Sequence, residues 1–257
     1  MRRIADLSFI LCLGMFLGCS RSQVDLAVDD VDERFEKGKM YLEKKKYYRA
    51  QQEFEYVLMR GRHTDLGDDA QFYLGESYYL NKEYLLAISE YDRLVRQMTY
   101  SPFVHKSRYR ICQSYIKKSP KYFHDQDYTI KAINKLQEFI EDYPESEFRD
   151  EVAESSEFLR AKLARKAYES AVLYTKMEEY ESAIRYYTDL LTSYYDTDYA
   201  DRARLGIVEI HLKVGEIHEA EEFISENENK FRDEETLRQA RSLLEEKKTD
   251  IKSGGKT

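Results

Sequence analysis

The stretch Gly38-Lys39-Met40-Tyr41 recurs 37 residues later as Gly75-Glu76-Ser77-Tyr78. An alanine lies twelve residues after each glycine, and an aromatic residue lies four residues after each alanine: Ala50 and Phe54, then Ala87 and Tyr91. Ala183 and Ala220 are again 37 residues apart. Small and aromatic residues at such a period are typical of helical pairs stacked into a solenoid, an architecture that binds other proteins. The repeat therefore predicts an all-α fold and a binding function.

The composition agrees with helices and argues against nucleic acid as a partner. The 257 residues include three prolines and ten glycines, too few for a turn-rich β fold. Charged residues make up 35% of the chain and alternate along it, as the exposed faces of amphipathic helices require. The formal net charge is −8, whereas phosphate binding needs a basic surface.

The irregularities of the repeat divide the chain. We expect repeats 1–3 within residues 32–147, with a loop over 118–125, because 20 residues rather than twelve separate Cys112 from Ala132. A further excess of 14 residues before Ala183 predicts one extended helix over about 148–173. Residues 148–248 would thus hold this helix, repeats 4 and 5 and a capping helix, and 249–257 would form a disordered tail. The apolar residues of the capping helix are Leu237, Ala240, Leu243 and Leu244.

The N-terminal residues predict export. Two arginines precede an apolar run over residues 7–17, which is too short for a transmembrane helix and long enough for a signal peptide. The run ends in Leu17-Gly18-Cys19, which resembles the lipobox of bacterial lipoproteins. That resemblance implies a signal peptide over 1–18, acylation of Cys19 and a lipidated flexible tether over 19–31. In bacterial lipoproteins an aspartate directly after the cysteine tends to retain the product in the inner membrane, so the same resemblance, with Ser20 at that place, implies the outer membrane. An ordinary secretory signal with an incidental cysteine is the alternative.

No catalytic residue, cofactor or metal site is predicted. The five histidines have no metal-ligand spacing, and no serine lies in a Gly-x-Ser-x-Gly setting. The C-terminal Gly255-Lys256-Thr257 lacks the first glycine of a phosphate-binding loop. Cys112 occupies a glycine position of the repeat, and we expect it to be a small buried packing residue.

The glycine, tyrosine, alanine and aromatic positions resemble the tetratricopeptide repeat. With the lipobox, the loop in repeat 3 and the extended helix before repeat 4, the chain resembles the BamD family, the lipoproteins of the β-barrel assembly machinery. The matching stretches are 87–94, 132–146 and 159–164, and the resemblance covers about 32–245. It implies a right-handed α-solenoid of about five tetratricopeptide-like helix pairs.

The resemblance also implies a role and partners. The protein would be a non-catalytic scaffold, lipid-anchored at the periplasmic face of the outer membrane. Its C-terminal repeats would dock on a POTRA domain of a BamA-like insertase, and its N-terminal repeats would receive unfolded outer-membrane protein precursors. Other assembly lipoproteins are further expected partners. Two alternatives stay open: a tetratricopeptide lipoprotein that scaffolds cell-wall or division proteins, and a carrier or enzyme subunit that binds a small ligand.

A peptide groove is expected on the inner face of the first three repeats. Residues three before and four after each glycine position would face inward and suit an extended peptide with a terminal aromatic residue. The alternative is that these side chains pack against the neighbouring repeat. The six residues are Phe35, Leu42, Phe72, Tyr79, Tyr109 and Ile116.

Overall fold

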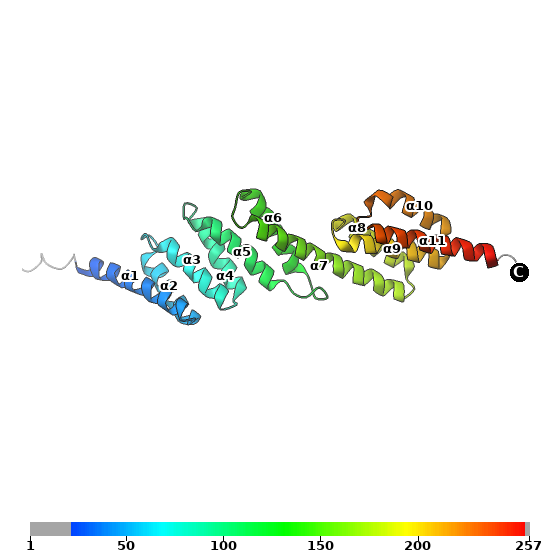
Figure 1. The fold of residues 1–257 in the computed structure, drawn as a ribbon. Coiled ribbons are helices and arrows are strands. Elements are labelled where there is room, and N and C mark those ends of the chain that lie inside the picture. Colours follow the sequence, from blue (N-terminus) through cyan, green and yellow to red (C-terminus); the bar gives the residue numbers. More distant parts are fainter. Residues whose placement is uncertain (1–21, 255–257) are drawn as a thin grey trace, which may run out of the picture. The chain divides into compact units, whose positions relative to one another are not determined.

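A computed structural model of the protein describes residues 22–254, with side chains from 30 to 252. Every regular element in this range is helical (Figure 1). The predicted signal peptide and Cys19 lie outside the described residues. Among the described helices, none has both the length and the apolar character that crossing a membrane requires. The described residues divide into two compact units, 22–114 and 115–254.

The first unit holds two helical pairs and most of α5. Its helices are α1 (Ser22–Glu43), α2 (Tyr47–Gly61), α3 (Gly67–Leu80), α4 (Tyr84–Gln97) and the larger part of α5 (Val104–Lys118). Consecutive helices from α1 to α4 pack against one another. Their core contains the repeat alanine Ala50 and the ring of Phe54, both fully buried, with Phe35 and Leu74 beside them.

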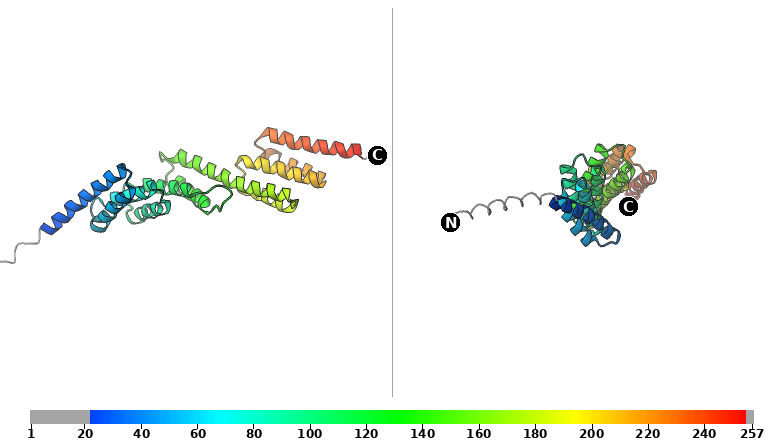
Figure 2. Two further views of the ribbon diagram at one scale, coloured as in Figure 1. Left: turned by 90° about the horizontal axis from the view of Figure 1, so that it is seen from below. Right: turned by 90° about the vertical axis from the view of Figure 1, so that its left-hand side faces the viewer.

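The second unit begins with the end of α5 and continues through seven elements. These are α6 (Asp127–Asp142), α7 (Arg149–Lys176), α8 (Tyr180–Ser193), α9 (Asp198–Val214), α10 (Ile217–Asn227), the 3-10 helix η1 (Glu228–Lys230) and α11 (Glu234–Gly254). The expected loop is the segment 119–126, and the expected extended helix is α7, with 28 residues. The capping helix is α11, which packs beside α9 and α10 (Figure 2) and buries Ala240 and Leu244.

The repeat glycines Gly38 and Gly75 lie where an aromatic ring of the following helix approaches the backbone closely. A Cβ atom added to Gly38 would stand 2.7 Å from the Phe54 ring, and one added to Gly75 would stand 2.5 Å from the Tyr91 ring. Real Cβ atoms do not approach other atoms this closely, so only glycine fits beside these aromatic rings. The second helices contribute alanines at the matching positions, and Ala50, Ala87, Ala132, Ala183 and Ala220 are all fully buried.

The turns that connect the two helices of four pairs share one backbone geometry. Each contains one residue with positive φ: Lys45 (54°), Lys82 (65°), Glu178 (62°) or Gly215 (89°). The backbone N–H of the residue after it donates a hydrogen bond to the carbonyl oxygen five residues earlier. In the last of these turns, Glu216 donates to His211 at 2.8 Å. A left-handed residue closes a helix in this way. Between α5 and α6 the chain has the loop 119–126 in place of such a turn.

Both ends of the helical region extend beyond the bounds predicted from the sequence. The helix α1 begins at Ser22, so residues 22–31 of the predicted tether are helical. The apolar spacing of Val31 and Phe35, which are buried, continues backwards to Val28 and Val24, and a helix anchored at one end propagates readily along such a sequence. At the other end, α11 continues to Gly254 through most of the predicted disordered tail.

Candidate protein-binding surfaces

Half of the predicted peptide groove is core. Phe35 (5% exposed), Phe72 (2%) and Tyr109 (7%) are buried, which corrects the expectation that they line an open surface. The ring of Phe72 stacks on Phe103 with centroids 4.6 Å apart, and Phe35 contacts the Phe54 ring edge-on at 5.8 Å. The position of a residue within its repeat does not determine how closely the following part of the chain covers its side chain. For these three residues the packing alternative is correct.

The other three groove residues are half-buried. Leu42 packs against the core of the first unit, and Ile116 lies near the end of α5. Tyr79 contacts Tyr84 edge-on at 5.6 Å, and the guanidinium of Arg110 lies 4.9 Å from its ring centroid. Part of each side chain therefore remains accessible to a partner.

A buried polar network holds the interior of the first unit together. Glu76 accepts hydrogen bonds from the Tyr91 hydroxyl at 2.5 Å and from Nε of Arg110 at 2.6 Å. Burial and the Glu76 carboxylate both raise the pKa of Tyr91, which keeps its hydroxyl protonated as a donor. These ionisable groups satisfy one another, so they serve the fold. Cys112 is buried, as expected. The described residues contain no acidic, histidine or cysteine cluster able to hold a metal.

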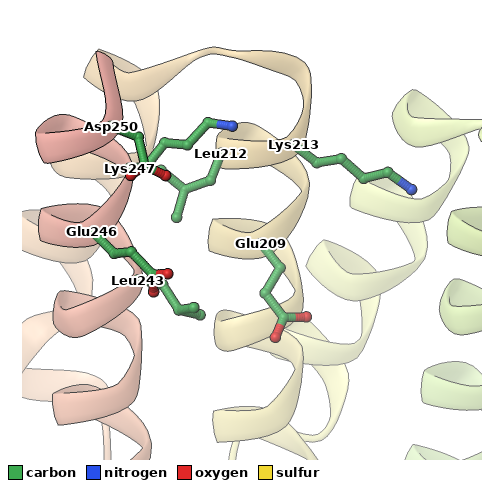
Figure 3. Close-up of a pocket in the computed structure, with 7 residues that line it drawn as sticks. All are labelled: Glu209, Leu212, Lys213, Leu243, Glu246, Lys247 and Asp250. Carbon is green, nitrogen blue, oxygen red and sulfur yellow. The ribbon is translucent and has the colours of Figure 1, made fainter. Parts of the chain in front are cut away.

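The second unit has a hollow between α9 and α11, which we call the α9–α11 hollow, with a volume of about 280 Å³. Leu212 on α9 and Leu243 on α11 form its apolar part, while Lys213 points away from α11 (Figure 3). Charged side chains of both signs surround the leucines, and partial burial raises the pKa of Glu209. An apolar centre with a charged rim is the usual make-up of a protein interface. The lining residues are Glu209, Leu212, Lys213, Leu243, Glu246, Lys247 and Asp250.

A more polar hollow of about 500 Å³ lies where the α8–α9 connection meets α7. Arg160 donates to both carboxylate oxygens of Asp196, at 3.0 and 2.7 Å, and to the carbonyl of Ser193 at 3.0 Å. The hydrogen bond from Arg160 lowers the pKa of Asp196. Arg232 donates to the carbonyl of Asp196. Because Arg160 and Asp196 are paired with each other, we interpret these contacts as holding α7 to the α8–α9 connection and not as a binding surface.

A third hollow lies between the loop 119–126 and α7, and its volume is about 580 Å³. We call it the loop groove. Its lining includes two exposed aromatic side chains, Phe123 and Phe158. Sequence reasoning identified the loop and missed the groove, because the α7 residues that complete it lie about 40 positions further along the chain.

Most of the chain is similar to a known protein family. The model of a family described as "YfiO: Outer membrane lipoprotein" matches residues 28–226. The outer membrane protein assembly factor BamD of Rickettsia prowazekii (strain Madrid E) is 22% identical over 228 residues, which cover 85% of this chain and 88% of that protein.

Two solved structures are also similar, with TM-scores of 0.45 and 0.34. The first is the TPR2AB-domain:pHSP90-complex of yeast Sti1, with 15% identity over 89% of this chain and 94% of that chain. The second is a thermophilic TPR protein of Thermus thermophilus, with 16% identity over 83% of this chain and 98% of that chain.

Proposed function

The chain belongs to the YfiO family of outer membrane lipoproteins, and we propose that it docks on the barrel insertase of the outer membrane through its C-terminal repeats. It is an outer membrane assembly factor of the BamD kind and not an enzyme.

The observation that carries the docking proposal is the composition of the α9–α11 hollow. Leu212 and Leu243 give it an apolar centre, and Glu246, Lys247 and Asp250 give it a charged rim on one helix. A folded periplasmic domain such as a POTRA domain could bury the leucines while its own charges pair with the rim. Apolar burial would then supply affinity, and the alternating charges would fix the register.

A charge swap on α11 tests this docking. Changing Glu246→Lys together with Lys247→Glu keeps the net charge of the chain and exchanges the charges at these two positions of the rim. We expect it to weaken binding to the purified POTRA domains of the insertase at least tenfold. A matched control exchanges Glu235 and Arg238, an exposed ion pair on the same helix, and should change the Kd less than twofold. If both swapped chains bind the POTRA domains equally well, the α9–α11 hollow is not part of the interface.

The competing function, a scaffold for cell-wall or division proteins, is tested by affinity purification. The full chain is tagged at its C-terminus and recovered from detergent-solubilised outer membrane. A POTRA-containing barrel protein and other assembly lipoproteins should co-purify with it. Recovery of murein enzymes without such a barrel protein would favour the competing function and contradict ours.

Precursor binding is proposed for the first unit, through the half-buried Leu42 and Tyr79. The probe is a peptide from the C-terminus of a barrel precursor that ends in an aromatic residue. Tyr79→Ala should weaken its binding, whereas Tyr100→Ala, at a fully exposed tyrosine of the same unit, should not. If Tyr79→Ala binds the peptide as the wild type does, the side chain serves packing alone.

Membrane attachment is proposed to occur through acylated Cys19, on the periplasmic face of the outer membrane. Stable anchoring needs more than one acyl chain, which a lipoprotein cysteine provides. Cys19→Ser should abolish incorporation of labelled palmitate and move the chain to the soluble periplasmic fraction. Retention of label in this variant would exclude Cys19 as the modified residue.

A further inference from the structure

The loop 119–126 is held in one conformation by a buried glutamine. The side-chain amide of Gln126 donates to the carbonyls of Lys121 at 2.8 Å and His124 at 2.9 Å. The Thr129 hydroxyl in turn donates to the amide oxygen of Gln126 at 2.7 Å. Because the backbone acceptors inside the loop are satisfied by one buried side chain, the loop does not have to be ordered when a partner binds.

Two lysines of α7 fasten the loop to that helix. The Lys162 ammonium donates to the Ser119 hydroxyl and, at 3.0 Å, to the carbonyl of Pro120. Lys166 donates to the carbonyl of His124 at 2.7 Å. The eight residues that lengthen repeat 3 therefore form a fixed wall beside α7, and the loop groove lies between the two.

The groove presents apolar surface that nothing in the described chain covers. Phe123 on the loop is 59% exposed and Phe158 on α7 is 67% exposed. Ala161, which is also on α7, lines the groove with a small side chain. The volume of about 580 Å³ is within the usual range of ligand and peptide pockets. Exposed aromatic side chains beside a concave surface mark an interaction site.

The charge of the loop groove is opposite to that of the chain. The formal net charge is −8, yet the groove lining contains three cations, Lys121, Lys162 and Arg165, and no carboxylate among the described residues. Arg165 lies 4.1 Å from the centroid of the Tyr122 ring, and its ion pair with Glu169, at 3.7 Å, is long. Both acceptors of Lys162 are neutral oxygens, and burial lowers its pKa.

We propose that the loop groove binds an extended segment of another protein in which carboxylates adjoin aromatic or large aliphatic side chains. The apolar side chains would cover Phe123 and Phe158, and the carboxylates would pair with Lys121 and Arg165. A membrane surface is a poorer match, because lipid recognition uses larger basic clusters and the negative chain is repelled by anionic headgroups. This surface is separate from the α9–α11 hollow and does not depend on the insertase.

A defined peptide tests the proposal with the full chain in detergent. The probe is the capped, fluorescently labelled peptide Gly-Ser-Phe-Asp-Phe-Asp-Gly-Ser, and its partner replaces both aspartates by asparagine. The aspartate peptide should bind about tenfold more tightly, since two exposed ion pairs each contribute a few-fold. The double change Lys121→Gln and Arg165→Gln should abolish this preference. Phe158→Ser should weaken both peptides.

The control removes two cations elsewhere in the second unit, Arg149→Gln with Arg185→Gln, both outside the groove lining. It should bind both peptides as the wild type does. Equal binding of the two peptides, or equal loss in the control, would overturn the proposal. A third outcome would also overturn it. If the Lys121→Gln, Arg165→Gln variant loses binding to phosphatidylglycerol vesicles but still binds the peptides as the wild type does, the groove recognises lipid and not a protein segment.

Discussion

The sharpest structural prediction concerns Gly75, where α3 meets α4. A methyl group at this position would stand 2.5 Å from Cε1 and 2.7 Å from Cδ1 of Tyr91. The Tyr91 ring is fully buried, and its hydroxyl donates to Glu76 at 2.5 Å. The ring is thus held at both ends and cannot swing aside. Gly75→Ala must separate the two helices or break the hydrogen bond.

The expected magnitude is the difference between two opposing effects. Overpacking a filled core costs about 1–3 kcal/mol. Alanine in place of glycine stabilises a helix interior by about 0.8–1 kcal/mol. Since the clash is with a ring that is fixed, we expect the upper part of the first range and a net loss of about 1–2 kcal/mol for Gly75→Ala.

A double-mutant cycle with Tyr91→Leu measures this. Urea unfolding is followed by circular dichroism for the wild type, both single variants and the double variant. In the Tyr91→Leu background the ring is absent, so Gly75→Ala should cost little or should stabilise by up to about 1 kcal/mol. If Gly75→Ala stabilises the wild-type chain, or if it lowers the free energy of unfolding equally in both backgrounds, the Tyr91 ring does not exclude a side chain at position 75.

Further predictions concern packing, pH and a turn. Phe72→Ala should lower the free energy of unfolding by about 3–5 kcal/mol in urea titrations, whereas the half-buried Tyr79→Ala should lower it much less. Because the hydrogen bond from Arg160 lowers the pKa of Asp196, the pair stabilises the fold above about pH 4 and this contribution is lost as pH falls through the folded-state pKa. The stability curves of the wild type and Asp196→Asn should therefore converge as the pH is lowered from neutral through the folded-state pKa; a constant gap would contradict this. Gly215→Ala should lower stability by about 1–2 kcal/mol through its positive φ alone, since a Cβ there meets no atom within 4 Å; an unchanged thermal midpoint would exclude this strain.

The sequence predicts the helical pairs well, because the spacing of small and aromatic residues along the chain is determined by the packing of neighbouring helices. The small residue at Gly75 and the ring of Tyr91 are a matched pair, and their 16-residue separation specifies a helical hairpin. The extra residues before Ala132 and Ala183 similarly indicate a loop and a long helix. These features depend on neighbours within one repeat or the next, so a single sequence contains enough information.

The surfaces could not be predicted in the same way. Whether Phe72 lines a groove or fills a core depends on how closely the following segment covers it, and the residue that does so, Phe103, lies outside the repeat pattern. The loop groove needs Arg165 beside Tyr122, a contact between residues 43 positions apart that only the tertiary fold creates. The one available signal was the pair of aromatic residues in the insertion.

Docking of the C-terminal repeats on a POTRA-containing insertase can be measured by cross-linking in cells. A photo-reactive amino acid is placed at position 246 on the rim of the α9–α11 hollow, and in a separate chain at the exposed position 222 on α10. After irradiation, position 246 should give an adduct with the barrel insertase, and position 222 should give none. An adduct of position 246 with a cell-wall enzyme, or equal insertase adducts from both positions, would show that the C-terminal repeats do not dock on the insertase through the α9–α11 hollow.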